Sequence, residues 1–188
     1  MLGVECRRTE VSAMANSSRV ETSQLTIRAW REQDVSTVYT MLREAAIVQH
    51  GEDDFCADPS TLSQDGFGSN PRVHCLVAEL RKEIVGILLY FFLYSTWTSR
   101  TGLYVEDLYV RPDHRRQGIA RALMSAAATV ALNAGCPYIQ WAILRNNSPA
   151  QRFYQSLGAV ALSEWSLMRI SGQQLEQLRA HNRAERIS

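Results

Sequence analysis

The most informative segment of the chain is Val110-Arg111-Pro112-Asp113-His114-Arg115-Arg116-Gln117-Gly118-Ile119-Ala120. It connects an apolar, strand-like run to an alanine-rich, helix-like run, and at such a turn the backbone N–H groups and the helix dipole favour an anion. Gly118 has no side chain and Ala120 a small one, so a pyrophosphate could approach the backbone closely. Arg115 and Arg116 could add positive charge at the rim. Taken alone, the segment equally fits a surface turn with solvated arginines.

Strand and helix signals alternate on both sides of this segment. Before it we expect a strand at Leu25 and Ile27, helices over Gln33–Ala46 and from Asp58 and Pro59 to Gly66, and strands over Val73–Leu80, Ile84–Tyr94 and Leu103–Val110. After it we expect a helix over Gly118–Asn133, a strand over Tyr138–Leu144, a helix over Ser148–Leu157 and a last strand over Val160–Ile170. This order predicts an α/β fold with a mixed sheet, in which antiparallel neighbours are followed by a β-α-β unit.

The chain of 188 residues is expected to hold one folded domain with two tails. Residues 1–23 are rich in Ser, Thr, Glu and Arg without a sustained period, which predicts a disordered extension. The domain is expected over residues 24–172, and residues 173–188 read as a C-terminal helix and tail.

The overall composition argues against several classes of function. With 20 basic and 19 acidic side chains, the net charge of +1 gives no electrostatic reason to expect a nucleic-acid or membrane partner. The longest apolar run, Ile84–Tyr94, is far shorter than the roughly 20 residues of a membrane helix. The cysteines and histidines lack metal-ligand spacing, so no metal is expected. We recognise no secretory signal and expect free thiols in a cytoplasmic protein.

Two motifs in this order resemble those of the GNAT N-acetyltransferase superfamily. The pattern R-x-x-G-x-A, formed by Arg115, Gly118 and Ala120, directly follows Leu108-Tyr109-Val110 and is similar to the superfamily's acetyl-CoA loop. Farther along, Asn147-Ser148-Pro149-Ala150-Gln151-Arg152-Phe153-Tyr154, followed by Leu157-Gly158-Ala159, resembles its second motif. The resemblance implies the GNAT fold: a mostly antiparallel central sheet flanked by helices, with a β-α-β core that binds acetyl-CoA.

Other segments narrow the resemblance to the spermidine/spermine and thialysine N-acetyltransferases. These are Asp65-Gly66-Phe67-Gly68, His74-Cys75-Leu76-Val77-Ala78-Glu79, Tyr94–Trp97 and Tyr104–Val110. The resemblance implies a homodimer that moves an acetyl group from acetyl-CoA to a primary amine of a small cationic substrate. In that subfamily an aromatic–acidic pair after the first helix contacts the polyamine, but the matching positions here are Gln49 and His50. A polyamine, another diamine and a thialysine or lysine analogue are therefore comparable candidates.

The resemblance also implies roles for individual residues. Glu106 would accept the proton of the amine, Tyr154 would protonate the departing thiolate, and a backbone N–H near Leu108 would stabilise the oxyanion. Contacts to acetyl-CoA are implied for Leu108, Tyr109, Val110, Arg115, Arg116, Gln117, Gly118, Ile119, Ala120, Arg121, Asn147, Ala150 and Tyr154. Contacts to the amine are implied for Glu106, Trp97, Gln140, Trp141 and Ala142.

Several of these residues also have simpler interpretations. Strand alternation puts Tyr104, Glu106 and Leu108 on one face and Val105 and Asp107 on the other. Glu106 could be a solvated acid on an edge strand, but its apolar neighbours favour a cleft, because a carboxylate among apolar residues is costly unless paired or solvated. Asp107 is expected to be structural.

Two further residues could be mistaken for catalytic groups. His114 titrates near neutrality in its free form, but it lies in the loop and is expected to be a surface residue. Cys75 is expected to be a small buried hydrophobe, although a thiol could accept the acetyl group in a two-step mechanism.

Two other functions remain open from the sequence. One is a protein or peptide N-acetyltransferase of the same superfamily, which would need an open substrate groove. The other is a non-catalytic module that binds acetyl-CoA without turnover.

Overall fold

The computed structural model describes residues 25–49, 51 and 53–184. The extension expected over residues 1–23 lies outside these residues, as do His50 and Glu52. The described residues form two units, one up to Ala142 and one from Ile143.

The first unit is built on a five-stranded sheet whose strands follow their order in the chain. The antiparallel strands are β1 (Leu25–Ala29), β2 (His74–Leu80), β3 (Glu83–Ser95) and β4 (Arg100–Val110). The last strand, β5 (Ile139–Trp141), pairs parallel with β4 and is shorter than the predicted Tyr138–Leu144. The mixed, mostly antiparallel sheet predicted from the sequence is confirmed.

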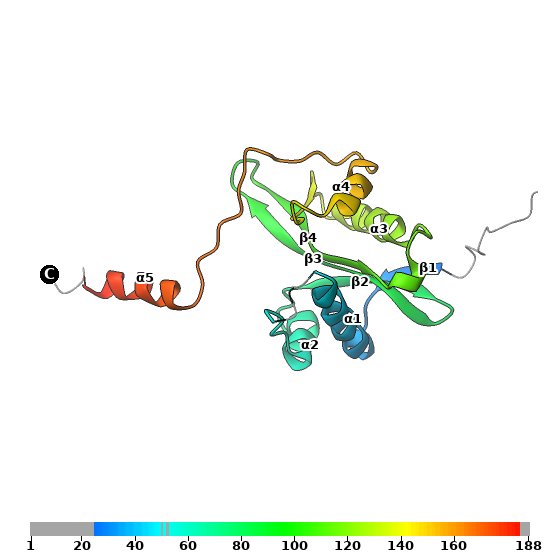
Figure 1. Cartoon of the computed structure of the whole chain (residues 1–188), viewed down its shortest axis with the longest axis horizontal. Coiled ribbons are helices and arrows are strands. Elements are labelled where there is room, and N and C mark those ends of the chain that lie inside the picture. The colour runs from blue at the N-terminus through cyan, green and yellow to red at the C-terminus, as the bar shows by residue number, and fades with distance from the viewer. Residues whose placement is uncertain (1–24, 50, 52, 185–188) are drawn as a thin grey trace, which may run out of the picture. The chain divides into compact units, whose positions relative to one another are not determined.

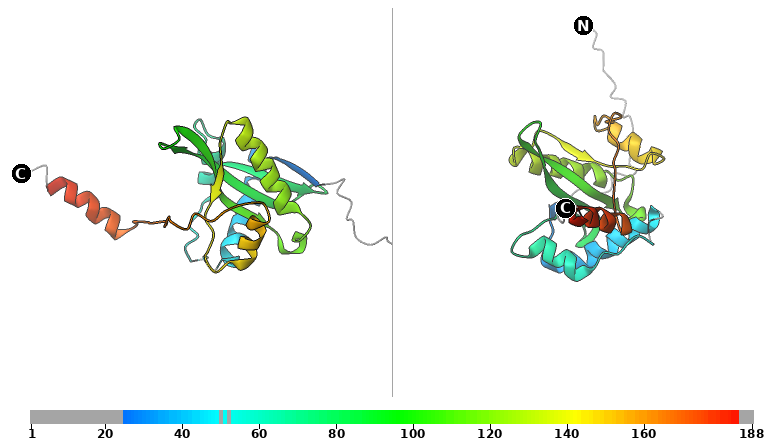
Figure 2. Two further views of the ribbon diagram at one scale, coloured as in Figure 1. Left: turned by 90° about the horizontal axis from the view of Figure 1, so that it is seen from above. Right: turned by 90° about the vertical axis from the view of Figure 1, so that its left-hand side faces the viewer.

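Helices cover both faces of this sheet (Figure 1). A short 3-10 turn, η2 (Glu32–Asp34), leads into α1 (Val35–Val48), which lies with α2 (Pro59–Phe67) on one face. On the other face lies α3 (Ile119–Asn133), which connects β4 to β5 and completes the predicted β-α-β unit. The right-hand view of Figure 2 shows the same separation. The core under α1 and α2 contains Trp30, Val35, Val38, Met41, Leu42, Ala45, Cys75, Val77, Ile84, Ile87, Leu89 and Tyr109.

Local signals account for the helix boundaries. The carboxylate of Asp58 accepts a hydrogen bond from the backbone N–H of Thr61 at 2.9 Å, so the predicted N-cap of α2 is confirmed. α3 begins after Gly118 and ends shortly before Gly135, both of which have positive φ angles.

Gly86 of β3 brings α3 close to the sheet. A Cβ atom at this position would lie 3.1 Å from Cγ2 of Ile119 and 3.3 Å from Cδ1 of Leu123. Because glycine has no side chain, the first turn of α3 packs directly on the backbone of β3.

β3 and β4 form a hairpin that continues beyond β2. His74, the first residue of β2, pairs with Tyr90, so among the described strands Phe91 to Ser95 pair only with β4. The hairpin is drawn in green and projects beyond its neighbours in the left-hand view of Figure 2.

The second unit contains α4 (Ser148–Gln155) and α5 (Gln173–Ala184). The helix predicted over Ser148–Leu157 and the C-terminal helix are thus confirmed. The strand predicted over Val160–Ile170 is wrong, because this segment has no strand structure. Instead the N–H of Trp165 donates to the carbonyl of Leu162, which closes a turn in its middle. Alternating apolar residues provide two faces, but a strand also needs an adjacent strand to pair with its backbone.

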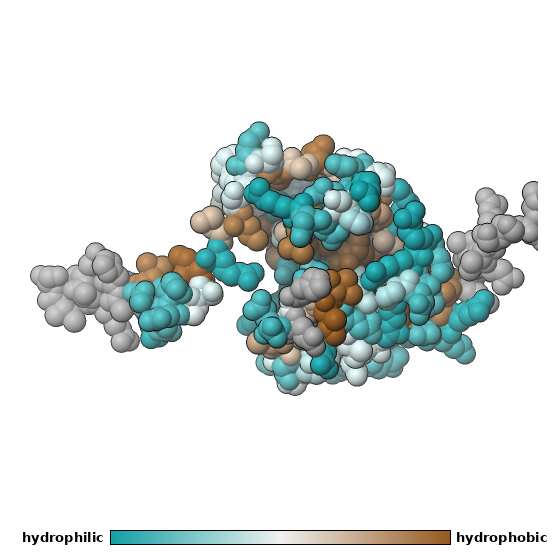
Figure 3. Space-filling model, viewed as in Figure 1, coloured by the Kyte–Doolittle hydropathy of each residue, from teal (hydrophilic) through white to brown (hydrophobic). Residues whose placement is uncertain are grey.

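The cysteines, the helices and the surface bear on the expectations drawn from composition. Cys56, Cys75 and Cys136, the cysteines of the described part, are free thiols as predicted. No helix among the described residues is long and apolar enough to cross a bilayer. Hydrophilic residues dominate the face seen in Figure 3, and apolar residues gather there in separate patches.

Candidate active site

The parallel strands β4 and β5 separate in the middle of β4. Their pairing joins Leu103 to Ile139, Tyr104 to Gln140 and Val105 to Trp141. Beyond Val105, the residues of β4 up to Val110 pair with no residue of β5. The backbone on this side of β4 is therefore outside the sheet ladder and can hydrogen-bond to a ligand.

A β-bulge lies at the point of separation. Leu89 of β3 pairs with Asp107 and Tyr90 pairs with Val105, which leaves Glu106 as an extra residue in β4. The Glu106 side chain is exposed, whereas Val105 before it is buried. Bulges redirect side chains and increase local twist. Glu106 is thus a solvated carboxylate at the fork of the two strands.

The bulge overturns the alternation expected for β4. Leu88 and Tyr90 share a face of β3, and their partners are Leu108 and Val105. Leu108 therefore shares a face with Val105. Strict alternation would have placed it on the face of Tyr104. The extra residue at Glu106 shifts the phase of the pattern by one position.

Asp107 is a half-buried carboxylate next to the bulge. Burial, and secondly the negative charge of Glu106, raise its pKa to about 6. Its cross-strand partner Leu89 belongs to the core under α1 and α2. Asp107 therefore titrates near neutral pH, which the sequence did not predict.

This shift predicts a pH-dependent cost in stability. The native pKa of Asp107, about 6, exceeds the ordinary value of 3.8, so the free energy of unfolding falls as pH rises between these values. Asp107→Asn should therefore stabilise the protein at pH 7.5 by about 1–3 kcal/mol. Thermal melts should show the gain at pH 7.5 and almost none at pH 4. An equal gain at both pH values would mean that the charge of Asp107 is not its source.

The loop after β4 leads into an open N-terminus of α3. Gly118 caps this helix with φ +82°, and a Cβ atom added to it would meet no other atom within 4 Å. The first amides of a helix have no carbonyl partner one turn earlier, and the helix dipole is positive there. Open space beside the N-terminus of α3 fits the pyrophosphate expected from the sequence.

The arginines of this loop are arranged differently from one another. Arg115 and Arg116 are both exposed, as expected for charges at a rim, and so is Arg121 in the first turn of α3. Arg115 also folds back toward β4, and its Nε donates a hydrogen bond to the carbonyl oxygen of Val110 at 2.9 Å. Its guanidinium carbon lies 5.7 Å from the centre of the Tyr109 ring. Arg115 therefore braces the end of β4.

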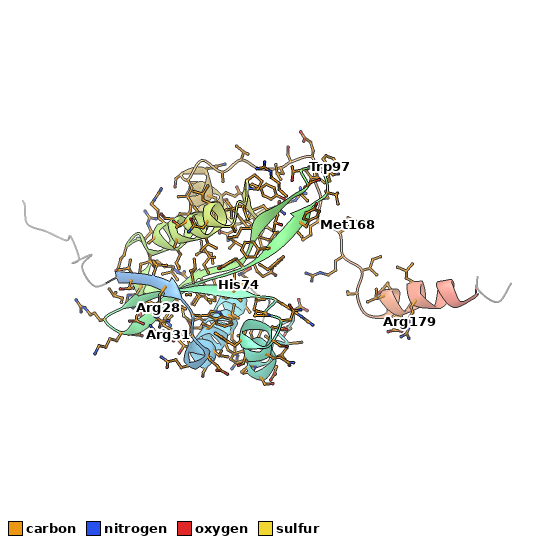
Figure 4. The ribbon with its side chains drawn as sticks, turned by 180° about the vertical axis from the view of Figure 1, so that it is seen from behind. Arg28, Arg31, His74, Trp97, Met168 and Arg179 are labelled. Atoms are coloured by element: carbon orange, nitrogen blue, oxygen red, sulfur yellow. The ribbon has the colours of Figure 1, made fainter. Side chains whose placement is uncertain are left out.

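The residues expected on the amine side are only partly brought together. Gln140 and Trp141 lie on β5 opposite Tyr104 and Val105, and thus beside the bulge at Glu106. Trp97 is 84% exposed at the tip of the β3–β4 hairpin, as Figure 4 shows. The six residue-to-residue steps from Arg100 to Glu106 span about 20 Å of strand. The first unit therefore does not bring Trp97 close to Glu106.

The candidates in the second unit lie on α4 or directly before it. Asn147 is the N-cap of this helix, and its Oδ1 accepts a hydrogen bond from the N–H of Ala150 at 3.1 Å. Burial raises the pKa of Tyr154 to about 12. The Tyr154 hydroxyl therefore keeps its proton at neutral pH.

Cys75 and His114, which could be mistaken for catalytic groups, have structural positions. Cys75 is 1% exposed, and burial raises the pKa of its thiol. Because the thiolate is the nucleophilic form, Cys75 is a packing residue and not an acetyl acceptor. His114 ends the 3-10 turn η3 (Pro112–His114), and its N–H donates to the carbonyl of Arg111 at 3.0 Å.

Sequence reasoning missed one residue near the loop. Oε2 of Glu44, on α1, lies 3.5 Å from Nε of Arg111. Glu44 follows the spacing of a solvated helix face between buried Leu42 and Ala45. Nothing in that local pattern indicates a partner directly after β4, so only the tertiary structure could find it.

Comparison with known proteins assigns the chain that carries this fork, bulge and loop to a family. The Acetyltransferase (GNAT) family matches residues 36–159 of the chain. The chain belongs to this family. It is therefore an acetyl-CoA-dependent N-acetyltransferase.

This GNAT enzyme resembles curated relatives and solved structures. It is 39% identical over 163 residues to thialysine N-epsilon-acetyltransferase of Sus scrofa, which covers 81% of the chain and 95% of the relative. It is 32% identical over 95 residues to L-ornithine N5-acetyltransferase of Arabidopsis thaliana, covering 50% of the chain and 42% of the relative. An integron cassette protein of V. cholerae superposes with a TM-score of 0.70 at 23% identity over 83% of this GNAT chain and 98% of that chain. That likeness supports the fold alone.

Proposed function

We propose that this enzyme acetylates the primary amine of a small cationic substrate by direct attack on acetyl-CoA. The observation that carries the proposal is the bulge at Glu106. It leaves an exposed carboxylate where β4 parts from β5, on the strand that runs into the glycine loop. A negative group at that point can attract a cation and take its proton.

In this mechanism Glu106 prepares the amine for attack. An alkylamine with a reference pKa of about 10.4 is almost fully protonated at pH 7 and cannot act as a nucleophile. Glu106 binds the ammonium and accepts its proton, directly or through one water molecule. The neutral amine then attacks the carbonyl carbon of the thioester.

The backbone stabilises the charge that develops on the thioester oxygen. A backbone N–H near Leu108, on the open side of β4, donates a hydrogen bond to this oxygen. The amides of the Arg115–Arg121 segment bind the pyrophosphate of acetyl-CoA. Together these contacts hold the thioester beside Glu106.

Tyr154 assists the departing thiolate. With a pKa of about 12 it donates a hydrogen bond, because complete proton transfer to a thiolate of lower pKa is uphill. Tyr154→Phe should therefore reduce kcat by only about tenfold, less than full general-acid catalysis would supply. The loss should shrink with acetyl donors whose thiols are more acidic. The same loss with every donor would mean that Tyr154 only positions the thioester.

The side-chain amine of a lysine-like amino acid is the substrate that we propose. Two relatives are named for thialysine and L-ornithine. The acetylated amine in such molecules ends a short chain that carries further charges. Gln49 at the end of α1 stands where polyamine enzymes have part of their contact pair, which favours this class over polyamines.

Release of CoA with a panel of amines tests this proposal. The panel contains thialysine, ornithine, lysine, putrescine, spermidine and a short lysine peptide. We expect the highest kcat/KM among the three amino acids. Preference for the peptide would support the protein N-acetyltransferase instead. Binding of acetyl-CoA without turnover of any amine would support the non-catalytic module.

We further propose that the enzyme is a cytoplasmic homodimer. The free thiols of the described part suit a reducing compartment, and the subfamily resemblance implies the dimer. Sedimentation at micromolar concentration should give twice the chain mass of 21.2 kDa. A monomer throughout that range would contradict the dimer.

A further inference from the structure

A cluster of charged and aromatic side chains joins α1 to the end of β4. Oε2 of Glu44 lies 3.5 Å from Nε of Arg111, the residue that follows β4. Arg111 also contacts Glu83 at 3.0 Å, and its backbone N–H donates to the carbonyl of Val85 at 3.0 Å. Arg111 thus begins the loop with its side chain and its backbone both held.

Tyr109 connects this ion pair to the brace formed by Arg115. The Tyr109 side chain is 7% exposed, and its pKa is raised by burial and then by the charge and hydrogen bonding of Glu44. Arg115 lies over the Tyr109 ring and lowers the pKa of the same hydroxyl. Glu44 therefore interacts with both Tyr109 and Arg111, one on each side of Val110.

The two acids that hold Arg111 are not equivalent. The Glu83 side chain is 63% exposed, so solvent screens its interaction with Arg111. The Glu44 side chain is 33% exposed and its partner Arg111 only 27%. Glu83 is the nearer of the two acids and accepts a hydrogen bond from Arg111 at 3.0 Å, whereas the Glu44–Arg111 pair is the less screened by solvent and the one that connects the loop to α1.

We propose that Glu44 is a positioning residue that sets the affinity for acetyl-CoA from α1. It holds Tyr109 and Arg111, and through Arg115 the carbonyl of Val110, so that the loop enters α3 in one conformation. Since acetyl-CoA is taken to bind at this loop, the inference rests on the proposed function. Glu44 itself touches no substrate in this mechanism.

The sign of the effect separates positioning from simple electrostatics. Glu44→Gln removes a negative charge near an anion site, which by Coulomb's law alone should tighten the binding of acetyl-CoA. A positioning role predicts weaker binding, because the loop loses its constraint. We expect the Kd of acetyl-CoA to rise about fivefold, within the range of couplings between contacting residues. KM for acetyl-CoA should rise by more than kcat falls.

Glu79→Gln is the matched control. Glu79 is 29% exposed and pairs with Arg28 at 2.8 Å, so its loss breaks a comparable ion pair. Glu79 lies on β2 and Arg28 on β1, where Figure 4 labels it, and their ion pair includes no residue of the loop. Isothermal titration with acetyl-CoA and thermal melts of both variants give the comparison. A Glu44→Gln protein with unchanged or tighter binding overturns the proposal, whatever its melting temperature.

Tyr109→Phe provides a second variant that deletes only a hydroxyl group. If Glu44 acts through this hydroxyl and Arg111 together, the double variant should lose less affinity than the sum of the two single losses. Strictly additive losses would overturn the shared network.

Failure of the proposed function would look different. An enzyme that binds acetyl-CoA but acetylates no amine overturns the function and leaves this inference standing if Glu44→Gln weakens binding. An enzyme that does not bind acetyl-CoA overturns both.

Discussion

Replacing Glu106 with glutamine should reduce kcat/KM for the amine by about a hundredfold or more, while the Kd of acetyl-CoA stays nearly constant. Glutamine keeps the shape of the side chain but neither attracts an ammonium nor accepts its proton. A charge-assisted contact contributes about 1.5–3 kcal/mol, and general base catalysis roughly a hundredfold or more. Steady-state kinetics with saturating acetyl-CoA and calorimetric titration of acetyl-CoA measure the two quantities.

The pH profile and a control variant make this test specific. The remaining activity of Glu106→Gln should rise steeply with pH, because the free amine must then be supplied by solution. Glu32→Gln, which neutralises another exposed glutamate on η2, should match the parent enzyme. If Glu106→Gln loses affinity for acetyl-CoA and keeps its affinity for the amine, then Glu106 serves the acetyl-CoA side of the site and not the amine side.

Gly118→Ala should raise the Kd of acetyl-CoA by about tenfold or more, the equivalent of one lost hydrogen bond to a charged group. Space for the methyl group exists in the free protein, but a pyrophosphate at the N-terminus of α3 would compete for it. The substitution also places a side chain at φ +82°, so it should lower stability by about 1 kcal/mol. Calorimetry and thermal melts measure both effects.

Gly135→Ala separates the two effects of this substitution. Gly135 lies just beyond the other end of α3 with φ +71°, and its Cβ position is equally open. Its substitution should cost similar stability and leave acetyl-CoA affinity intact. Equal affinities of the two alanine variants for acetyl-CoA would remove Gly118 from the binding site.

The sequence predicted those elements whose signals are local. Asp58 and Pro59 marked the start of α2, and Gly118 and Gly135 marked the two ends of α3, because caps and left-handed turns depend on one residue at a time. The strand predicted over Val160–Ile170 failed for the opposite reason. A strand needs a neighbouring strand to pair with, and the residues of a segment do not show whether such a neighbour is present.

The candidate site was predictable in its residues but less so in its geometry. Glu106 stood out as an acid in an apolar strand, yet the bulge that exposes it comes from register between β3 and β4. The raised pKa of Asp107 follows from the same tertiary setting. Glu44 gave no sequence signal, because its partners Tyr109 and Arg111 lie at the end of β4 and directly after it, far along the chain.

The close contact at Gly86 sets the distance between α3 and the sheet, and this distance determines where the N-terminus of α3 lies. The missing side chain lets Ile119, the first residue of α3, rest against β3. Alanine at position 86 would require its neighbours to give way by a few tenths of an ångström, and a bulkier side chain should push the first turn of α3 away from the sheet, together with the amides that we propose bind pyrophosphate. Position 86 is therefore a place where the affinity for acetyl-CoA could be lowered without changing any residue proposed to contact it.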